Sequence, residues 1–311
     1  MLSKKTLGVP VGLAAAFALA AAGMASGAAA AESPKTMDWQ GRGPVKTYKT
    51  AWEHFQALKA AAHGGTKKTF ADLPDWTGLW ERARRPEGWP YPFDLTEPAG
   101  GPTTAKLTPE YQAKFDKKMA DFRKGIEWDP LSYCLPAGMP RWLTEPRPRE
   151  YIVRPEAVWM STEQQSEFRR VYTDGRGHVP EDEAYPLWEG DSIGFWDGDT
   201  LVVHTNHMKA GQYQRQQPDY SDQVETVEEI RKVSPTLIED RTTVYDPPSL
   251  LEPWVTIQKY EKIEAGDNLR INMWSCNENN NVVKTAEGVT QFILPGEAGY
   301  KDPKTLGKPP Q

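Results

Sequence analysis

The sequence predicts a mainly β fold, an antiparallel barrel preceded by two accessory helices. After Glu150, short segments rich in β-branched and aromatic residues follow one another with no clear helix between them. Tight-turn sequences such as Asp174-Gly175 and Asp197-Gly198 separate many of these segments. This pattern favours an antiparallel meander, and about nine strands are enough to close a barrel without exposed edges.

The expected strands are 151–153, 157–162, 167–173, 192–196, 200–206, 225–233, 237–245, 254–263 and 269–276. The segment 225–233 is ambiguous, because its apolar residues also fit helical spacing.

Two helices are expected before the barrel. The first spans 50–63, with Phe55 and Leu58 on its apolar side, and Gly64-Gly65 ends it. The second spans 109–124. It has Thr108 as N-cap and places Tyr111, Phe115, Met119 and Phe122 at helical spacing. We interpret this second helix as a structural lid or plug on the barrel.

The first residues have the pattern of a secretory signal peptide. Lys4 and Lys5 precede an apolar stretch, and the run Ala28–Ala31 contains an A-x-A cleavage site near Ala30-Ala31. An uncleaved anchor helix is the alternative. No later apolar run is long enough to span a membrane. We therefore expect a periplasmic or secreted mature chain without a membrane span.

The expected domain organisation has four parts: a signal peptide (1–31), an arm with the first helix (32–70), the barrel domain (71–296) and a disordered tail (297–311).

Charge and composition limit the partners. The formal net charge of −6 becomes −8 without Lys4 and Lys5, and no block of Lys and Arg stands out. A nucleic-acid partner or an anionic membrane is therefore not expected. Twelve Trp, twelve Tyr and nine Phe indicate an aromatic-rich core or cavity.

The two cysteines, Cys134 and Cys276, form no C-x-x-C motif. In an exported chain an even count favours one long-range disulfide between them. Two buried free thiols are the alternative, and a catalytic cysteine is the least favoured interpretation.

Alternate residues on several strands combine aromatic rings with hydrogen-bonding groups. Such sets line a ligand cavity if they face inward, and ordinary solvent-facing surface if they face outward. They give the candidate ligand-binding residues Asn206, Trp254, Gln258, Asn272 and Trp274.

Among the five histidines, we expect His54 and His63 to be solvated on the first helix. His204 is the candidate general base, with an acidic neighbour fixing its tautomer. A structural histidine bonded to backbone is the alternative. His178, His204 and His207 could bind zinc only if the strand ended between His204 and His207, because residues three apart on a strand face opposite sides. We predict no metal and no cofactor.

The leading functional prediction is a protein that binds a small apolar or aromatic molecule in a polar-lined cavity. The first alternative is a cofactor-independent lyase, isomerase or hydrolase. In that enzyme His204 would be the base, Tyr172 and Arg170 would polarise the substrate, and Asp174 or His178 would assist. The second alternative is a structural or interaction protein of the cell envelope. No G-x-S-x-G, Walker, Rossmann or H-E-x-x-H motif is present.

Residues 133–280 also resemble a large, mostly uncharacterised family of exported bacterial proteins. The segments that carry the resemblance are Tyr133-Cys134-Leu135-Pro136, Gly138-Met139-Pro140-Arg141, 169–176, 192–203, Asp246-Pro247, Pro253-Trp254 and 276–280. The resemblance implies a lipocalin-like β-barrel and supports Cys134 and Cys276 as a pair, but it implies no established reaction. The chain departs from the family pattern at His204 and His207, where Asp and a small residue are more usual.

Overall fold

The computed structural model describes residues 48–83, 105–126, 129–264, 268–274, 282–284 and 290–300. The chain divides into two compact units, Met1–Asp38 and Trp39–Gln311, and every described residue belongs to the second. The expected leader and most of the expected tail therefore lie outside the described residues.

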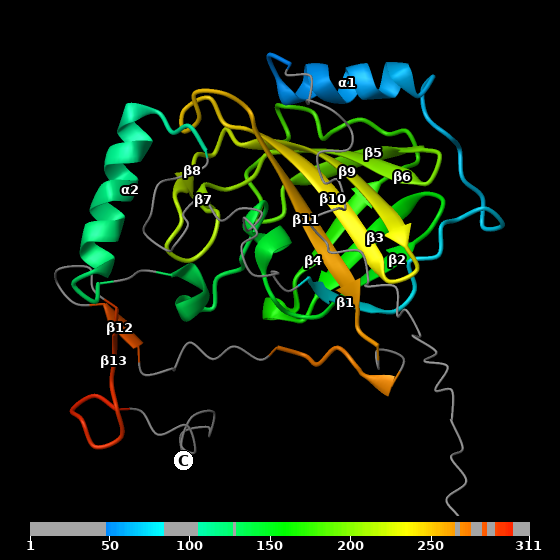
Figure 1. Cartoon of the computed structure of the whole chain (residues 1–311). Helices are drawn as coiled ribbons and strands as arrows, with labels where there is room; N and C mark the ends of the chain where they lie inside the picture. The colour runs from blue at the N-terminus through cyan, green and yellow to red at the C-terminus, as the bar shows by residue number, and fades with distance from the viewer. Residues whose placement is uncertain are drawn as a thin grey trace, which may run out of the picture. The chain divides into compact units, whose positions relative to one another are not determined.

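Nine strands form a closed barrel in the order β1-β11-β10-β9-β6-β5-β4-β3-β2 (Figure 1). They are β1 (Leu79–Arg82), β2 (Arg149–Val153), β3 (Ala157–Thr162), β4 (Phe168–Tyr172), β5 (Asp191–Asp197), β6 (Thr200–Asn206), β9 (Glu225–Ser234), β10 (Leu237–Tyr245) and β11 (Trp254–Lys262). The predicted lipocalin-like barrel is confirmed, and the ambiguous segment 225–233 is a strand.

One pair of neighbouring strands departs from the predicted antiparallel pattern. Strands β4 and β5 run parallel, with Val171 beside Ser192 and Tyr172 beside Ile193. A parallel pair needs a connection that returns along the sheet. The turn at Asp174-Gly175 therefore begins a long crossover, 173–190, and does not close a hairpin.

The barrel has an inner and an outer face on every strand, as the alternation predicts. On β6, Leu201 and Val203 belong to the main core, whereas Val202 belongs to a second, smaller core. The registers of β5 and β9 with β6 extend the inner face to Trp196 and Ile230. The two faces therefore meet different surroundings.

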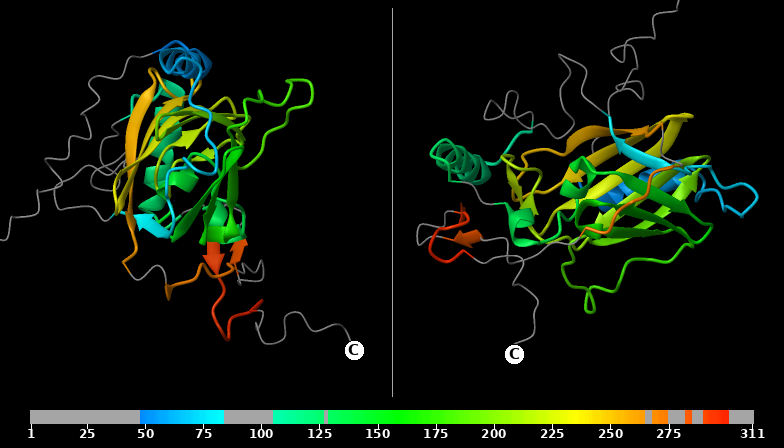
Figure 2. Two further views of the ribbon diagram at one scale, coloured as in Figure 1. Left: turned by 90° about the vertical axis from the view of Figure 1, so that its right-hand side faces the viewer. Right: turned by 90° about the horizontal axis from the view of Figure 1, so that it is seen from below.

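Helix α1 (Ala51–Ala61) covers part of the outer wall and creates the second core (Figures 1 and 2). Thr50 caps it by accepting the Glu53 N–H at 3.1 Å. Phe55 packs against the outward residues of β5, β6, β9 and β10. The helix was predicted correctly. His54, which we expected to be solvated, is instead 4% exposed because it faces Tyr245 on the wall.

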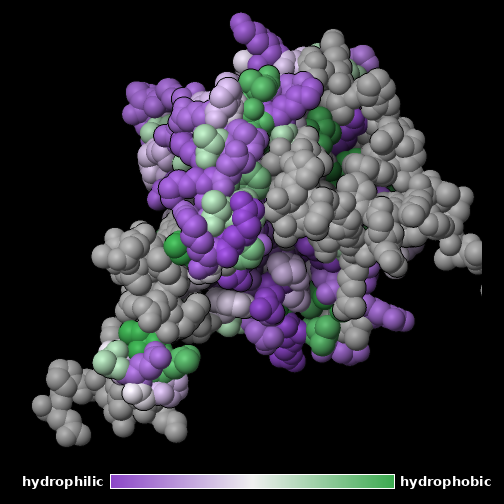
Figure 3. All heavy atoms as spheres, turned by 60° about the vertical axis from the view of Figure 1, so that its left-hand side comes forward, coloured by the Kyte–Doolittle hydropathy of each residue, from purple (hydrophilic) through white to green (hydrophobic). Residues whose placement is uncertain are grey.

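Helix α2 (Pro109–Phe122) buries Phe115 and Met119, while hydrophilic side chains cover its outward side (Figure 3). It contacts β8 (Asp219–Tyr220), which pairs with β7 (Gly211–Gln212) in a separate ribbon. Thr108 precedes the helix as predicted, but its hydroxyl donates to the Pro248 carbonyl and does not cap the helix. No helix among the described residues is long and apolar enough to cross a membrane.

Three short 3-10 helices and one more ribbon complete the described part. They are η2 (Pro130–Tyr133), η3 (Arg141–Thr144), η4 (Gln164–Ser166), and the antiparallel strands β12 (Val282–Lys284) and β13 (Thr290–Phe292). The strand expected at 269–276 is wrong in its described part, because residues 269–274 form no ladder.

Candidate functional site

Two predicted ligand-binding residues, Trp254 and Gln258, face the barrel interior from β11. Both are buried, and Trp254 packs edge-to-face on Tyr213 with ring centroids 5.2 Å apart. Gln258 donates to Thr256 at 3.4 Å, and its carbonyl oxygen lacks a hydrogen-bond partner among the described residues. On this strand, the face that carries Trp254 and Gln258 is therefore the inner one of the two orientations that the sequence left open.

A polar network occupies the interior beside these residues. Arg169 on β4 binds both carboxylate oxygens of Glu228 on β9, at 2.7 and 2.6 Å, and donates to Thr205. The guanidinium of Arg149 lies over the Trp142 and Tyr260 rings, 4.7 and 4.1 Å from their centroids. All three charged groups are buried. Arg169 and Glu228 are bonded to each other, and Arg149 donates to the Glu145 carbonyl at 2.7 Å, so these groups act as internal structure.

Three candidate catalytic residues lie together on the outer wall. Arg170 is exposed and donates to the Tyr172 hydroxyl at 3.4 Å. The Arg176 guanidinium lies 3.9 Å from the Tyr172 ring centroid and bonds both oxygens of Asp174. This cluster faces solvent, because β4 turns its odd-numbered residues, not Arg170 and Tyr172, toward the core.

The remaining candidate ligand residues do not share a cavity. Asn272 is exposed and its side chain and backbone both donate to Glu163. Trp274 is bonded through its backbone to Ser166 and stacks on Arg147. Asn206 ends β6 on the outer face. Arg170, Tyr172, His204 and Asn272 therefore do not line one interior space.

His204 and His178 form a hydrogen-bonded chain with two carboxylates beneath α1. Nδ1 of His178 lies 2.7 Å from Asp191 Oδ2, and Nε2 of His178 lies 2.7 Å from Nδ1 of His204. Nε2 of His204 lies 3.1 Å from Glu225 Oε2. The ring of Trp52 on α1 covers the two imidazoles. The predicted acidic neighbour of His204 is thus present, on the outer wall.

The number of ring hydrogens limits how many of these contacts are hydrogen bonds at once. Ionised carboxylates only accept, so Nδ1 of His178 and Nε2 of His204 donate to them. Two neutral imidazoles then have no hydrogen left for the contact between the rings. Burial lowers the pKa of His204, which favours its neutral form with the hydrogen on Nε2.

The position of His207 bears on the zinc alternative. Strand β6 ends at Asn206, and His207 has a φ of 52°, so the strand does end between His204 and His207. His207 instead lies 3.4 Å from Glu181. In the described ranges, no three His, Cys, Asp or Glu side chains form a set of metal ligands.

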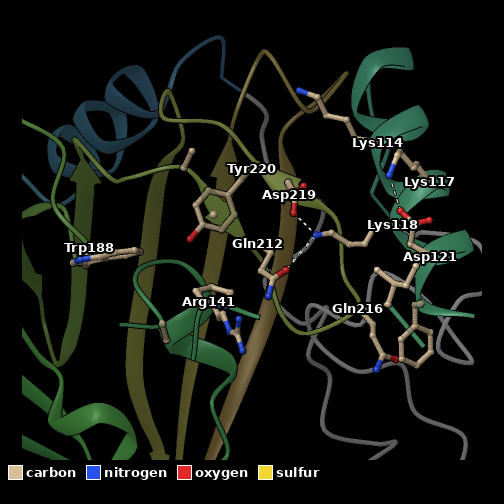
Figure 4. A pocket seen from close by; sticks show the side chains of 16 residues that line it. Lys114, Lys117, Lys118, Asp121, Arg141, Trp188, Gln212, Gln216, Asp219 and Tyr220 are labelled. Atoms are coloured by element: carbon tan, nitrogen blue, oxygen red, sulfur yellow. Dashed lines mark hydrogen bonds and ion pairs between the residues drawn. The ribbon is translucent and has the colours of Figure 1, made fainter. Parts of the chain in front are cut away.

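A pocket of about 580 Å³ lies between α2, η2, η3 and the β7–β8 ribbon (Figure 4). None of its lining residues belongs to the nine barrel strands. They are Lys114, Lys117, Lys118, Asp121, Phe122, Ile126, Pro130, Ala137, Arg141, Trp188, Ala210, Gly211, Gln212, Gln216, Asp219 and Tyr220. We call it the α2 pocket.

Two cations in the wall of the α2 pocket are held rigidly. Arg141 is 2% exposed and binds Asp129 through both terminal nitrogens and Glu145 through Nε. Lys118 binds Asp219, the Gln212 side chain and the Gln217 carbonyl. Burial raises the pKa of Tyr220, so its hydroxyl stays protonated.

The α2 pocket was not predicted from the sequence. The helix was predicted and interpreted as a structural lid or plug, and its lysines were not assigned to a site. The other walls come from segments too short to show periodicity, such as Gly211–Gln212 and Asp219–Tyr220. The only available signal was the amphipathic helix itself, which had to cover something apolar.

Comparison with known proteins gives no further guide: no protein-family model matches the chain, and no curated protein is significantly similar to it. Among the described residues no cysteine is free, and Cys134 is disulfide-bonded. Its predicted partner, Cys276, lies outside the described residues, so the pairing stays a prediction.

Proposed function

We propose that the protein binds a small molecule in the α2 pocket and that the barrel is the scaffold that holds the pocket walls. The observation that carries this proposal is a cavity of about 580 Å³ with aromatic rings and charged groups in one lining. Ligand pockets of drug-sized molecules have volumes of about 300–1,000 Å³ and combine apolar walls with a few polar groups.

The walls support binding because they are already ordered. The bond of Arg141 to Asp129 ties η3 to the start of η2, and the bond of Lys118 to Asp219 ties α2 to β8. A preformed pocket loses less conformational freedom when a ligand enters. The ligand is a small apolar or aromatic molecule, for which Trp188, Tyr220 and Phe122 provide surface.

The enzyme alternative has weaker support. It needs His204, Tyr172 and Arg170 around one substrate. His204 bonds to His178 and Glu225, whereas Arg170 and Tyr172 bond to each other. We therefore assign the histidine chain a structural role.

We also propose that the mature chain is exported and belongs to the family that residues 133–280 resemble. The pattern of residues 1–31 and the disulfide-bonded state of Cys134 support export, because disulfides persist in oxidising compartments. Intact mass of the protein from a periplasmic fraction tests it. A mature start near Ala31 and a Cys134–Cys276 bond are expected. An uncleaved cytoplasmic chain would overturn the proposal.

The binding proposal is tested by filling the pocket. Ala210 lines it and is exposed, so Ala210→Trp narrows it without entering the core. The matched control is Ala71→Trp, in the exposed loop after α1. Saturation-transfer NMR with 2-naphthoate and 2-naphthamide should show binding to the wild type and the control, with a dissociation constant on the order of 0.1–1 mM. Binding should be lost in Ala210→Trp. Absence of binding of both probes, or equal binding in all three proteins, would refute the site.

A further inference from the structure

The α2 pocket has two chemically different ends. Trp188 and Tyr220 lie at the end nearer the barrel, and Lys114, Lys117 and Lys118 lie at the end formed by α2 (Figure 4). The two lining carboxylates are each bound to a lysine of α2: Asp121 lies on the helix itself, and Asp219 lies on β8 beside Tyr220 (Figure 4). The end nearer the barrel therefore offers aromatic surface, with only the already paired charge of Arg141 beside it, and the helix end offers lysines.

The cations in the wall of the α2 pocket are not equally available. Lys118 is three-quarters buried and bonded to Asp219, Gln212 and Gln217, so its charge is fixed within the wall. The charge of Arg141 is matched by Asp129 and Glu145. Neither residue can turn toward a ligand without breaking buried bonds.

Lys114 and Lys117 differ from them. Each pairs with one carboxylate of the same helix, Glu110 at 2.8 Å and Asp121 at 2.6 Å. Their side chains are 49% and 79% exposed. The Lys114 ammonium also lies 4.1 Å from the Tyr111 ring centroid. Exposed ion pairs and exposed cation–π contacts each contribute at most about 1 kcal/mol, so both ammonium groups can turn toward an anion at the pocket mouth.

Resting on the binding function above, we propose that the ligand is an aromatic acid. Its ring system lies against Trp188 and Tyr220, and its carboxylate points to Lys114 and Lys117. Flat rings match the two aromatic side chains, which favour stacked or edge-to-face partners. The carboxylate pairs with the ammonium groups of Lys114 and Lys117, which no buried hydrogen bond in the described part of the chain holds in place. The aliphatic stems of these lysines cover the middle of the ligand.

The test compares probes of one shape and different charge. Binding of 2-naphthoate, 2-naphthamide and decanoate is measured in the wild type and in the Lys114→Gln/Lys117→Gln double variant. The control double variant, Lys59→Gln/Lys67→Gln, makes the same change in net charge near α1. Neither pair of substitutions alters a buried contact.

We expect 2-naphthoate to bind the wild type about tenfold more tightly than 2-naphthamide, with the advantage shrinking as salt rises. The α2 double variant should lose most of this advantage and bind the amide as before, whereas the control variant should match the wild type.

Equal affinity for 2-naphthoate and 2-naphthamide would overturn the proposal that the ligand is an acid. So would a preference for 2-naphthoate that the α2 double variant retains. Neither result would contradict the binding function. Tighter binding of decanoate than of 2-naphthoate would overturn the aromatic part. Failure of every probe would instead refute the pocket function itself.

Discussion

The Nε2 atom of His178 lies 2.7 Å from the Nδ1 atom of His204, and each ring bonds a carboxylate through its other nitrogen. This contact joins the crossover 173–190 to the outer wall of the barrel. When both rings are neutral, their two hydrogens go to the carboxylates and none lies between the facing nitrogens. The contact therefore gains a hydrogen bond only when one ring takes up a further proton.

Replacing His178 should show how much its contact with His204 stabilises the fold. His178→Asn leaves the buried Nδ1 of His204 without its partner, which costs about 1–3 kcal/mol. Nitrogen-15 NMR at pH 7 should show a neutral His204 with its hydrogen on Nε2 in the wild type, because burial lowers its pKa and Glu225 accepts from that atom. His63→Asn, at an exposed histidine, is the control and should leave stability unchanged. A protonated His204 in the wild type at pH 7 would contradict this tautomer.

Acid should destabilise the protein through His54. Burial, with Arg241 and His204 nearby, lowers its pKa from 6.5 to about 4. The unfolded chain therefore takes up this proton at a higher pH than the folded chain, and stability falls as pH drops from 6.5 to 4. The loss attributable to His54 is about 2 kcal/mol. Urea unfolding at pH 7 and 4.5 measures it.

The variant His54→Gln keeps a hydrogen-bond acceptor for the Tyr245 hydroxyl and removes the titration. Its stability should change less between the two pH values than that of the wild type. His63→Gln should keep the wild-type pH dependence. A pH dependence that His54→Gln leaves intact would show that His54 is not its source.

Removing one partner of the interior Arg169–Glu228 pair should lower the free energy of unfolding strongly, whereas replacing both partners by apolar residues should lower it little. Arg169→Met leaves the Glu228 carboxylate buried and unpaired, with a loss of about 3–5 kcal/mol. The double variant Arg169→Met/Glu228→Leu should recover most of this loss. Arg154→Met, in the exposed Arg154–Glu156 pair, serves as control and should cost less than about 1 kcal/mol. Thermal or chemical unfolding of all three variants decides it, and an Arg169→Met effect as small as the control would refute the role of the pair.

Gly190 marks the point where the crossover rejoins the barrel. Its φ is 65°, and a Cβ atom there would lie 2.5 Å from the backbone oxygen of Asn206. Gly190→Ala should therefore destabilise the protein by about 1–3 kcal/mol. Gly177→Ala, in the same crossover, meets no atom within 4 Å and should be neutral. Equal midpoints of thermal unfolding for the two variants would contradict this.

Much of the barrel could be predicted because its signals are local. The turn Asp197-Gly198 and the alternation on both sides of it specify the β5–β6 hairpin, whose register runs from Asp191–Asn206 to Asp197–Thr200. Helix α1 was predictable from Thr50, Phe55 and the glycines that follow. Each of these features depends on residues close together in the chain.

The site could not be predicted, because it depends on which face of each strand is inside. His204 shares its face with Val202, and this face is buried too, because α1 covers the outer wall. A strand face that carries both polar and apolar residues, as this one does, can lie either inside the barrel or beneath a covering helix. The parallel β4–β5 pair and the α2 pocket likewise depend on contacts between segments far apart in the sequence.

Because β4 and β5 run parallel, the connection between them should tolerate insertions better than deletions. Between Tyr172 and Asp191 the backbone must run back along the barrel, a distance of about 15–20 Å for strands of this size. Insertions there would lengthen a surface path and leave the strand order intact. Deletions that left only a tight turn would reverse β5 and remove His178 from His204. We therefore expect the surface residues of this crossover to be replaceable without a change in the barrel.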